Sequence, residues 1–238
     1  MLIDTHCHIH DKEMFLLDPD EVLARAKAAG VERVIVIGAC PTDARHAQEF
    51  AATREGVFWA YGYHPGEKEE PFEFFRDDKL VSIGEIGLDY HYGREDRDAQ
   101  IKRFEMMLHV AQREELPVNF HVREAFEDFW PIVDDFQLKG AVLHSFSDSE
   151  ENLNNGIKRG MFVGVNGLAT FAKIPLPPLE WMVFETDAPF LTPKPFRGTI
   201  NEPGYVKNIA DWVAVNQERT FGEVSEITTR NAERLFNL

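Results

Sequence analysis

Short runs of apolar and β-branched residues alternate with longer amphipathic segments along the whole chain. The runs are nearly continuous in hydrophobic character, which is typical of parallel strands buried on both faces. They predict strands at residues 1–6, 33–37, 57–63, 80–86, 117–122, 141–146, 161–165 and 182–186. Eight strands with intervening helices make a closed barrel, so we expect the α/β class and a (β/α)₈ TIM barrel.

The amphipathic segments between these runs carry helix caps. The segment Asp18-Pro19-Asp20-Glu21 predicts a helix start, and Gly30 predicts its end. Either Thr42 or Asp43 is expected to cap the next helix. Further helices are predicted at 98–115, from 148 to 160, and at 223–236.

The connection between the last two predicted strands departs from this pattern. Residues 168–180 include Pro175, Pro177 and Pro178, and each proline removes a backbone donor. This predicts a short, mostly irregular crossover in place of a helix. Because no linker or low-complexity tract interrupts the chain, residues 1–238 are expected to form one domain.

Composition and charge narrow the function. The 238 residues carry 25 Lys and Arg against 41 Asp and Glu, a formal net charge of −16. This balance argues against a protein that holds nucleic acid through a broad basic face, although cations inside a pocket would still attract a phosphodiester. No apolar run approaches the roughly 18 residues of a membrane span, and we expect no membrane contact and no obligate protein partner. Two cysteines without a CxxC motif favour the cytoplasm.

Histidines and carboxylates fall at the carboxyl ends of the predicted strands. In a parallel barrel these ends converge on one face, where the active site forms. Imidazoles and carboxylates gathered there are typical of a divalent-metal site. The residues in these positions are His6, His8, His64, Glu85, His121, His144 and Asp187.

The first strand ends in Asp4-Thr5-His6-Cys7-His8. The two-residue period of a strand places Asp4, His6 and His8 on one side, so both imidazoles can face the barrel axis and share one metal. Cys7 is expected to point toward the helices as a packing residue. Asp187 ends the eighth strand, next to the first, and can bind the same metal and accept a proton from its water. A turn aspartate before Ala188-Pro189 is the alternative.

Glu85 lies in an apolar strand flanked by glycines, where a buried charge is costly unless it is paired or bound to metal. Its two oxygens can bridge two cations, and His121 and His144, on neighbouring strands, can bind the second. An ion pair with a barrel arginine remains an alternative for Glu85. Asp89 either orients a neighbour or caps the loop.

Two further residues are candidates for substrate contacts. His64, in Gly62-Tyr63-His64-Pro65, is better suited to donate a hydrogen bond to substrate or transition state than to bind metal. Arg123 can meet an anionic oxygen or form a structural salt bridge.

Seven blocks of the sequence, in this order, resemble the TatD family of metal-dependent hydrolases. They are DTHCH (4–8), GYHP (62–65), GEIGLDY (84–90), HVREA (121–125), LHSFS (143–147), ETDAPFL (185–191) and RGTINEP (197–203). The resemblance implies a TIM barrel of the amidohydrolase-like superfamily and deoxyribonuclease activity. It also implies one metal at the first two histidines and Asp187, another at His121 and His144, and Glu85 shared between them.

This chain departs from the family pattern in two places. Members usually carry a full helix between the seventh and eighth strands, and a glycine where Asp148 stands here.

The leading hypothesis is metal-dependent hydrolysis of a phosphodiester, with DNA as substrate, Asp187 and Glu85 as catalytic residues, and His64 or Arg123 on the phosphate. Two divalent cations are expected per chain; Mg²⁺ or Mn²⁺ suits phosphate chemistry, whereas four histidines favour Zn²⁺. One alternative is hydrolysis of a C–N or ester bond in a small molecule or aminoacyl-tRNA. Another is a non-catalytic metal-binding barrel.

Overall fold

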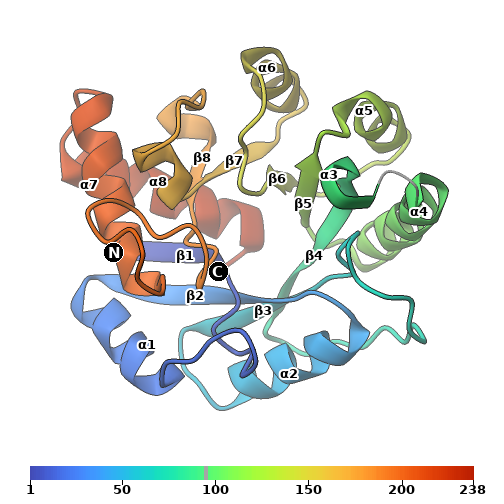
Figure 1. The fold of residues 1–238 in the computed structure, drawn as a ribbon, viewed down its shortest axis with the longest axis horizontal. Coiled ribbons are helices and arrows are strands. Elements are labelled where there is room, and N and C mark those ends of the chain that lie inside the picture. Colours follow the sequence, from blue (N-terminus) through green and yellow to red (C-terminus); the bar gives the residue numbers. More distant parts are fainter. Residues whose placement is uncertain (94–95) are drawn as a thin grey trace.

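Parallel strands form a barrel around which the helices are arranged (Figure 1). The computed structural model describes residues 1–93 and 96–238, and within them eight strands pair in sequence order. An isolated parallel bridge between Cys7 and Ala188, four residues after the end of the last strand, joins the two edges of the sheet. The strands are β1 (Leu2–Cys7), β2 (Val31–Gly38), β3 (Val57–Tyr61), β4 (Leu80–Asp89), β5 (Val118–Arg123), β6 (Ala141–Leu143), β7 (Phe162–Val165) and β8 (Met182–Phe184). The expected TIM barrel is confirmed.

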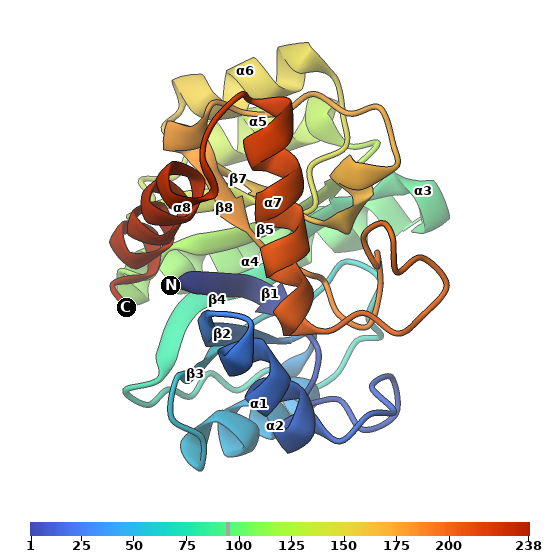
Figure 2. The ribbon, with the colours of Figure 1, turned by 90° about the vertical axis from the view of Figure 1, so that its left-hand side faces the viewer.

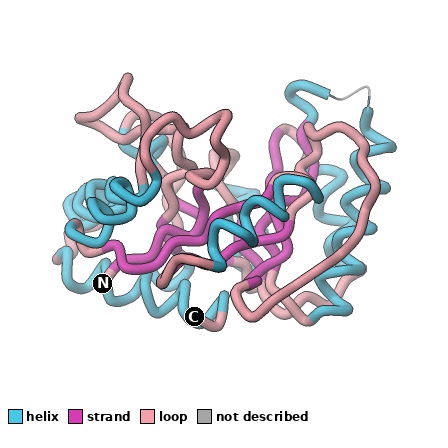
Figure 3. Tube along the Cα trace, turned by 90° about the horizontal axis from the view of Figure 1, so that it is seen from below, coloured by secondary structure: helices cyan, strands magenta, loops and turns pink. Residues whose placement is uncertain are grey.

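Helices lie on the outside of the strands, which occupy the centre of the molecule in a second view (Figure 3). Helices α3, α5 and α7 were not among the predicted elements. The helices are α1 (Pro19–Ala28), α2 (Pro41–Ala52), α3 (Tyr90–Gly93), α4 (Arg97–Glu114), α5 (Phe126–Asp134), α6 (Glu150–Lys158), α7 (Val206–Asn216) and α8 (Phe221–Phe236). None of the described helices is long and apolar enough to cross a membrane.

The helix starts follow local chemistry. The Asp18 side chain caps α1 as predicted, accepting hydrogen bonds from two backbone N–H groups of the first turn. The predicted cap of α2 is wrong: the helix begins at Pro41, and Cys40 is its N-cap. Proline is favoured at the first helical position because its φ is already helical and its missing N–H would lack a partner there. Asp43 is thereby left to accept hydrogen bonds from other partners.

The connection from β3 to β4 differs from a regular barrel unit. Residues 62–79, all of which are described, contain no helix. Phe72 and Phe75 from this segment pack against Tyr61 of β3, and Phe75 stacks on Trp59 at 5.7 Å between ring centroids. Aromatic side chains therefore cover a stretch of the outer barrel surface that a helix would otherwise bury.

The connection from β7 to β8 is also short of regular structure, as its prolines predict. Only two short 3₁₀ turns, Gly167–Thr170 and Leu179–Trp181, lie within this fully described segment. The barrel wall next to β8 is thus built from loop rather than from an α-helix.

Two apolar clusters hold the barrel together. The larger lies between strands and helices and includes Val22 of α1, Val36 of β2 and Phe104 of α4. The smaller includes Ile3 and Ile35 of adjacent strands, together with residues from the end of α8. The latter are Ala232, Leu235 and Phe236.

Helix α8 also binds the start of the chain, because the Thr229 hydroxyl donates to the Met1 carbonyl at 2.8 Å. The chain ends lie near each other in Figure 2. Apolar packing with α8 thus involves the amino-terminal parts of the strands. The polar side chains lie at the carboxyl ends of the strands.

Candidate metal centre

A cleft of about 490 Å³ opens at the carboxyl ends of the strands. The sequence-predicted residues meet there: His8, His64, Glu85, His121, Arg123, His144 and Asp187 all line it. His6 lies beneath, with no exposed surface. Among the described residues, three overlapping sets of histidines and carboxylates have ligand atoms within 4.8 Å of one another.

The first set brings together the end of β1 and the segment that follows β8. Nε2 of His6 and Nε2 of His8 lie 3.3 Å apart. Oδ1 of Asp187 is 3.7 Å from the first nitrogen and 3.5 Å from the second. The Asp187 N–H donates to the His6 carbonyl at 2.9 Å, which fixes this carboxylate beside β1. These three side chains present one imidazole–imidazole–carboxylate face to the cleft.

Glu85 lies between this set and the other histidines. Its Oε2 is 3.4 Å from Nε2 of His6, whereas its Oε1 is 2.6 Å from Nδ1 of His121 and 3.7 Å from Nε2 of His144. Burial alone would raise the pKa of Glu85, but the neighbouring imidazoles of His144, His121 and His64 hold it well below its usual range. An anionic carboxylate therefore faces two groups of nitrogen donors.

Three histidines have an outer partner on the ring nitrogen that points away from the cluster. His8 Nδ1 is 3.2 Å from the Ile37 carbonyl, which fits a donated hydrogen bond. His121 Nε2 is 2.9 Å from Asp89, and His144 Nδ1 is 3.0 Å from Glu185. Partners of this kind fix the imidazole tautomer and orientation at metal sites. They leave the inner nitrogen of each ring facing the cluster.

The charges behind two of these rings also change their protonation. Burial lowers the pKa of His121, but the charge of Glu85 and hydrogen bonds to Asp89 and Glu85 outweigh it and raise the pKa to about 9. Burial likewise lowers the pKa of His144, and the charges of Glu185 and Glu85 outweigh it and raise the pKa to about 10. Without a cation, both rings are protonated on both nitrogens and positively charged at neutral pH.

His64 is arranged in the opposite way. Its outer nitrogen, Nδ1, accepts a hydrogen bond from the Gly66 N–H at 3.0 Å. Nδ1 therefore carries no proton, and in the neutral ring the proton is on Nε2, 3.9 Å from Glu85. Burial lowers the pKa of His64 to about 4, so the ring stays neutral. Its distances alone would allow a metal ligand, but the Gly66 contact favours a hydrogen-bond donor.

The loop that carries His64 is held by Arg103 of α4. One guanidinium nitrogen donates to the carbonyls of His64 at 3.1 Å and of Glu67 at 2.8 Å. The guanidinium also lies over the Tyr63 ring, 4.3 Å from its centroid. The donor geometry of His64 is thus fixed from outside the cleft.

Two glycines allow β4 to approach β5 at the site. A Cβ on Gly84 would lie 2.4 Å from the Asn119 carbonyl oxygen, and one on Gly87 would lie 1.9 Å from the His121 carbonyl oxygen. Their φ angles, 147° and 149°, are also ones that other residues rarely adopt. The glycines on both sides of Glu85 therefore bring its strand close to that of His121.

Two buried acids lie near the site but outside the predicted set of ligands. Asp4 does not join the cluster, because its carboxylate accepts hydrogen bonds from the Thr186 N–H and hydroxyl and from the His6 N–H. Burial raises the pKa of Asp4 to about 8 despite the Thr186 hydrogen bonds. Glu185, fully buried behind His144, was missed; its charge in an apolar strand end was the available signal.

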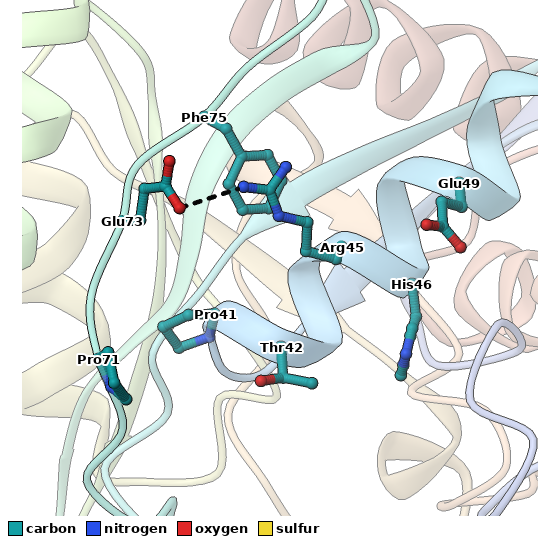
Figure 4. A pocket seen from close by; sticks show the side chains of 8 residues that line it. All are labelled: Pro41, Thr42, Arg45, His46, Glu49, Pro71, Glu73 and Phe75. Atoms are coloured by element: carbon teal, nitrogen blue, oxygen red, sulfur yellow. Dashed lines mark hydrogen bonds and ion pairs between the residues drawn. The ribbon is translucent and has the colours of Figure 1, made fainter.

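A second, smaller groove lies on the outer surface between α2 and the helix-free 62–79 connection (Figure 4). There the Arg45 guanidinium lies 3.6 Å from the Phe75 ring centroid and 3.5 Å from Glu73. No ligand-spaced set of histidines and carboxylates found in the described part of the chain includes residues of this groove. Within the described residues, the groups with metal-ligand spacing lie at the strand ends.

Comparisons with known proteins identify the family of this chain. The family model described as TatD related DNase matches residues 3–237. The chain is 36% identical to YabD of Bacillus subtilis, described as an uncharacterized metal-dependent hydrolase, over 100% of each. It is 31% identical to the 3'-5' ssDNA/RNA exonuclease TatD of Citrobacter rodentium, over 94% of each.

Solved structures show the same relationship. The crystal structure of YjjV, a TatD homolog from Escherichia coli, superimposes with a TM-score of 0.88 at 27% identity and covers 100% of this chain and 98% of that one. A structure of a TatD family hydrolase from Entamoeba histolytica has the same fold, with a TM-score of 0.86 at 22% identity over 99% of this chain and 97% of that one. The chain belongs to the TatD family of metal-dependent hydrolases.

Proposed function

We propose that this protein hydrolyses phosphodiester bonds in DNA with two divalent cations bound in the cleft. The position of Glu85 carries the proposal, because one of its oxygens faces His6 and the other faces His121 and His144. A carboxylate with one oxygen toward each of two histidine groups suits a bridging ligand. The exonuclease named among the relatives supports nucleic acid as substrate.

The donor set fits divalent cations. We assign His6, His8 and Asp187 to one ion and His121 and His144 to the other, with Glu85 shared. Four imidazoles favour Zn²⁺ or another transition ion, whereas Mg²⁺ and Mn²⁺ suit phosphate substrates. The nitrogens that face the cluster, Nε2 of His6, His8 and His144 and Nδ1 of His121, support this assignment.

The residues of the cleft divide the chemistry between them. Bound cations supply Lewis-acid activation of water and charge neutralisation at the phosphate. Asp187 accepts the proton of the attacking water, since hydrogen bonding to His8 and the nearby imidazoles keep its pKa low despite burial and leave it ionised. His64 donates from Nε2 to a phosphate oxygen, and Arg123, at the cleft surface, contacts a second anionic oxygen. The two unpaired cysteines are consistent with a reducing compartment such as the cytoplasm.

The test combines metal analysis of the purified protein with a nuclease assay. We expect about two metal equivalents per chain and chelator-sensitive cleavage of DNA that returns when Mg²⁺, Mn²⁺ or Zn²⁺ is added. Carbonyl substrates, including esters, amides and aminoacyl-tRNA, form the comparison panel. Activity on that panel alone would replace the phosphodiester assignment, and full activity in a metal-free protein would overturn the metal assignment. Loss of all hydrolysis in Asp187→Asn would exclude a non-catalytic barrel.

A further inference from the structure

An exposed aromatic side chain stands at the mouth of the metal cleft. Phe190 lines the cleft three residues after Asp187, and 48% of its surface is exposed. Met14, on the loop after β1, also lines it and is 39% exposed. Together with Leu168 and Leu191 they give the cleft an apolar wall, which adjoins the polar cluster of histidines and carboxylates. We refer to these four residues as the apolar wall.

The Phe190 position is fixed by the backbone around it. Its N–H donates to the Asp187 carbonyl at 2.8 Å, which closes a turn directly after the site. The fully buried Asn201 amide donates to the carbonyl of Phe190 at 2.5 Å and to that of Thr186 at 2.8 Å. The chain therefore holds an exposed aromatic residue at a constrained distance from Asp187. The ring, exposed over about half of its surface and lining the cleft, is available to a ligand there.

We propose that the apolar wall, with Phe190 at its centre, stacks against a nucleobase of the strand whose phosphate lies at the cluster. This rests on the proposed function. A nucleotide joins an anionic phosphate to a flat aromatic base, and the cleft joins a cation-binding floor to an apolar wall. Single-strand-binding proteins use aromatic side chains in this way, and each stacked base contributes about 1–3 kcal/mol.

The charge of the protein favours such a contact. With a net charge of −16, the surface repels a polyanion at long range, and contacts to phosphates outside the cleft contribute little. Affinity for a strand must then come from within the cleft, where stacking is insensitive to the base sequence because every base has a π-face. Recognition is expected to be tolerant of sequence and to require an unpaired base.

The test uses metal-loaded protein and two short single-stranded oligonucleotides. One has normal bases, and the other has abasic nucleotides at the cleaved end, so that phosphates are kept and the stacking partner is removed. Wild-type protein should show a KM about tenfold higher for the abasic strand, with a smaller change in kcat, since stacking is made in the ground state. In Phe190→Ala the KM for the normal strand should rise about tenfold, and the two strands should become equivalent. Phe190→Tyr should restore the difference.

The control is Phe196→Ala. Phe196 is also exposed on the segment after β8, but it stacks on Tyr205 and does not line the cleft. It should leave the preference for bases unchanged. A second readout is independent of turnover: 2-aminopurine at the end of a strand made resistant to cleavage by phosphorothioate linkages should lose fluorescence on binding to metal-loaded wild-type protein, and less on binding to metal-loaded Phe190→Ala.

Outcomes separate the two proposals. Equal cleavage of both strands by wild-type protein, or an unchanged base preference in Phe190→Ala, would overturn the stacking site and leave the nuclease assignment in place. Failure of wild-type protein to cleave either strand with any added metal would overturn the nuclease function and the stacking site with it.

Discussion

Oε1 of Glu185 lies 3.0 Å from Nδ1 of His144, with the glutamate fully buried behind the imidazole. The same oxygen accepts a hydrogen bond from the Ser145 N–H at 2.7 Å. This arrangement orients the ring so that Nε2 faces the cleft. Glu185 is thus a positioning residue for His144 that contacts no substrate.

Glu185→Gln removes the negative charge and keeps the side-chain shape. Metal affinity at the His144 side should fall by about 10- to 100-fold, because outer partners raise the basicity of a histidine ligand and fix its orientation. Competition against a fluorescent chelator measures this without relying on turnover. Glu180→Gln, on the exposed surface before β8, is the control and should bind metal normally. Equal affinities in the two variants would show that Glu185 has no such role.

A second prediction separates the donor role of His64 from that of a ligand. His64→Ala should lower kcat by about 100-fold, the usual loss for one transition-state donor, while metal content stays unchanged. His8→Ala should lower both kcat and the metal content, since the Nε2 atom of His8 faces the first metal position. Metal analysis and single-turnover kinetics on both proteins provide the comparison, with the exposed His46→Ala as the control. If His64→Ala loses metal as His8→Ala does, the tautomer inferred from Gly66 is wrong.

The metal-free protein should become less stable as the pH rises above neutrality. His121 and His144 have folded-state pKa values of about 9 and about 10, above the ordinary value of 6.5. The stability they contribute is complete below pH 6.5 and is lost as the pH rises through 9 to 10. Asp4, with its pKa raised to about 8, acts in the same direction because the folded state holds its proton longer than the unfolded chain.

The measurement is the melting temperature of chelator-treated protein between pH 6.5 and pH 9.5. It should fall steadily, and His144→Gln should reduce the fall. Metal binding should release protons in calorimetry at pH 7, since the inner nitrogens must be unprotonated to bind. A melting temperature that does not change over this range, together with binding that releases no protons, would contradict the assigned protonation states.

The glycines beside Glu85 give a prediction about stability. Gly87→Ala should cost about 2–5 kcal/mol, from the strained φ and the contact of its Cβ with the His121 carbonyl. Gly160→Ala is the matched control: its φ is also positive, at 77°, but a Cβ there meets open space. It should cost only about 1–2 kcal/mol. Urea denaturation measures both, and equal losses would show that the close approach of β4 to β5 is not constraining.

Much of the fold could be predicted from the sequence because buried parallel strands are apolar along their whole length. All eight predicted strands are present among the described residues, with ends that differ by a few positions. The sixth was extended to Phe146 on hydrophobicity, but the strand ends at Leu143 and Ser145 has a positive φ of 48°. A regular barrel unit has a helix between β3 and β4, but this chain has aromatic packing there that local sequence patterns do not specify.

The sequence was enough to predict which residues meet in the candidate site, but not their protonation and hydrogen bonds. Strand-end position was enough to bring His121 and His144 near Glu85, because the topology of a parallel barrel dictates it. The proton position on His64 depends on one backbone N–H, and the Asp4 carboxylate is held by the Thr186 N–H and hydroxyl, 182 positions away in the sequence. Such features come from local backbone geometry between residues far apart in sequence, which a single sequence does not reveal.

The closure of the barrel between β8 and β1 has a further consequence for the unfolded chain. Asp4 and Thr186 meet across this closure although 182 positions separate them. A cation bound by His6, His8 and Asp187 would join the same two ends and act as a removable cross-link around most of the polypeptide. Cross-links that close long loops restrict the denatured ensemble most strongly, with a cost that grows with the logarithm of loop length. A cation bound at this position would therefore raise the free energy of unfolding, because it keeps the two ends of the chain from separating.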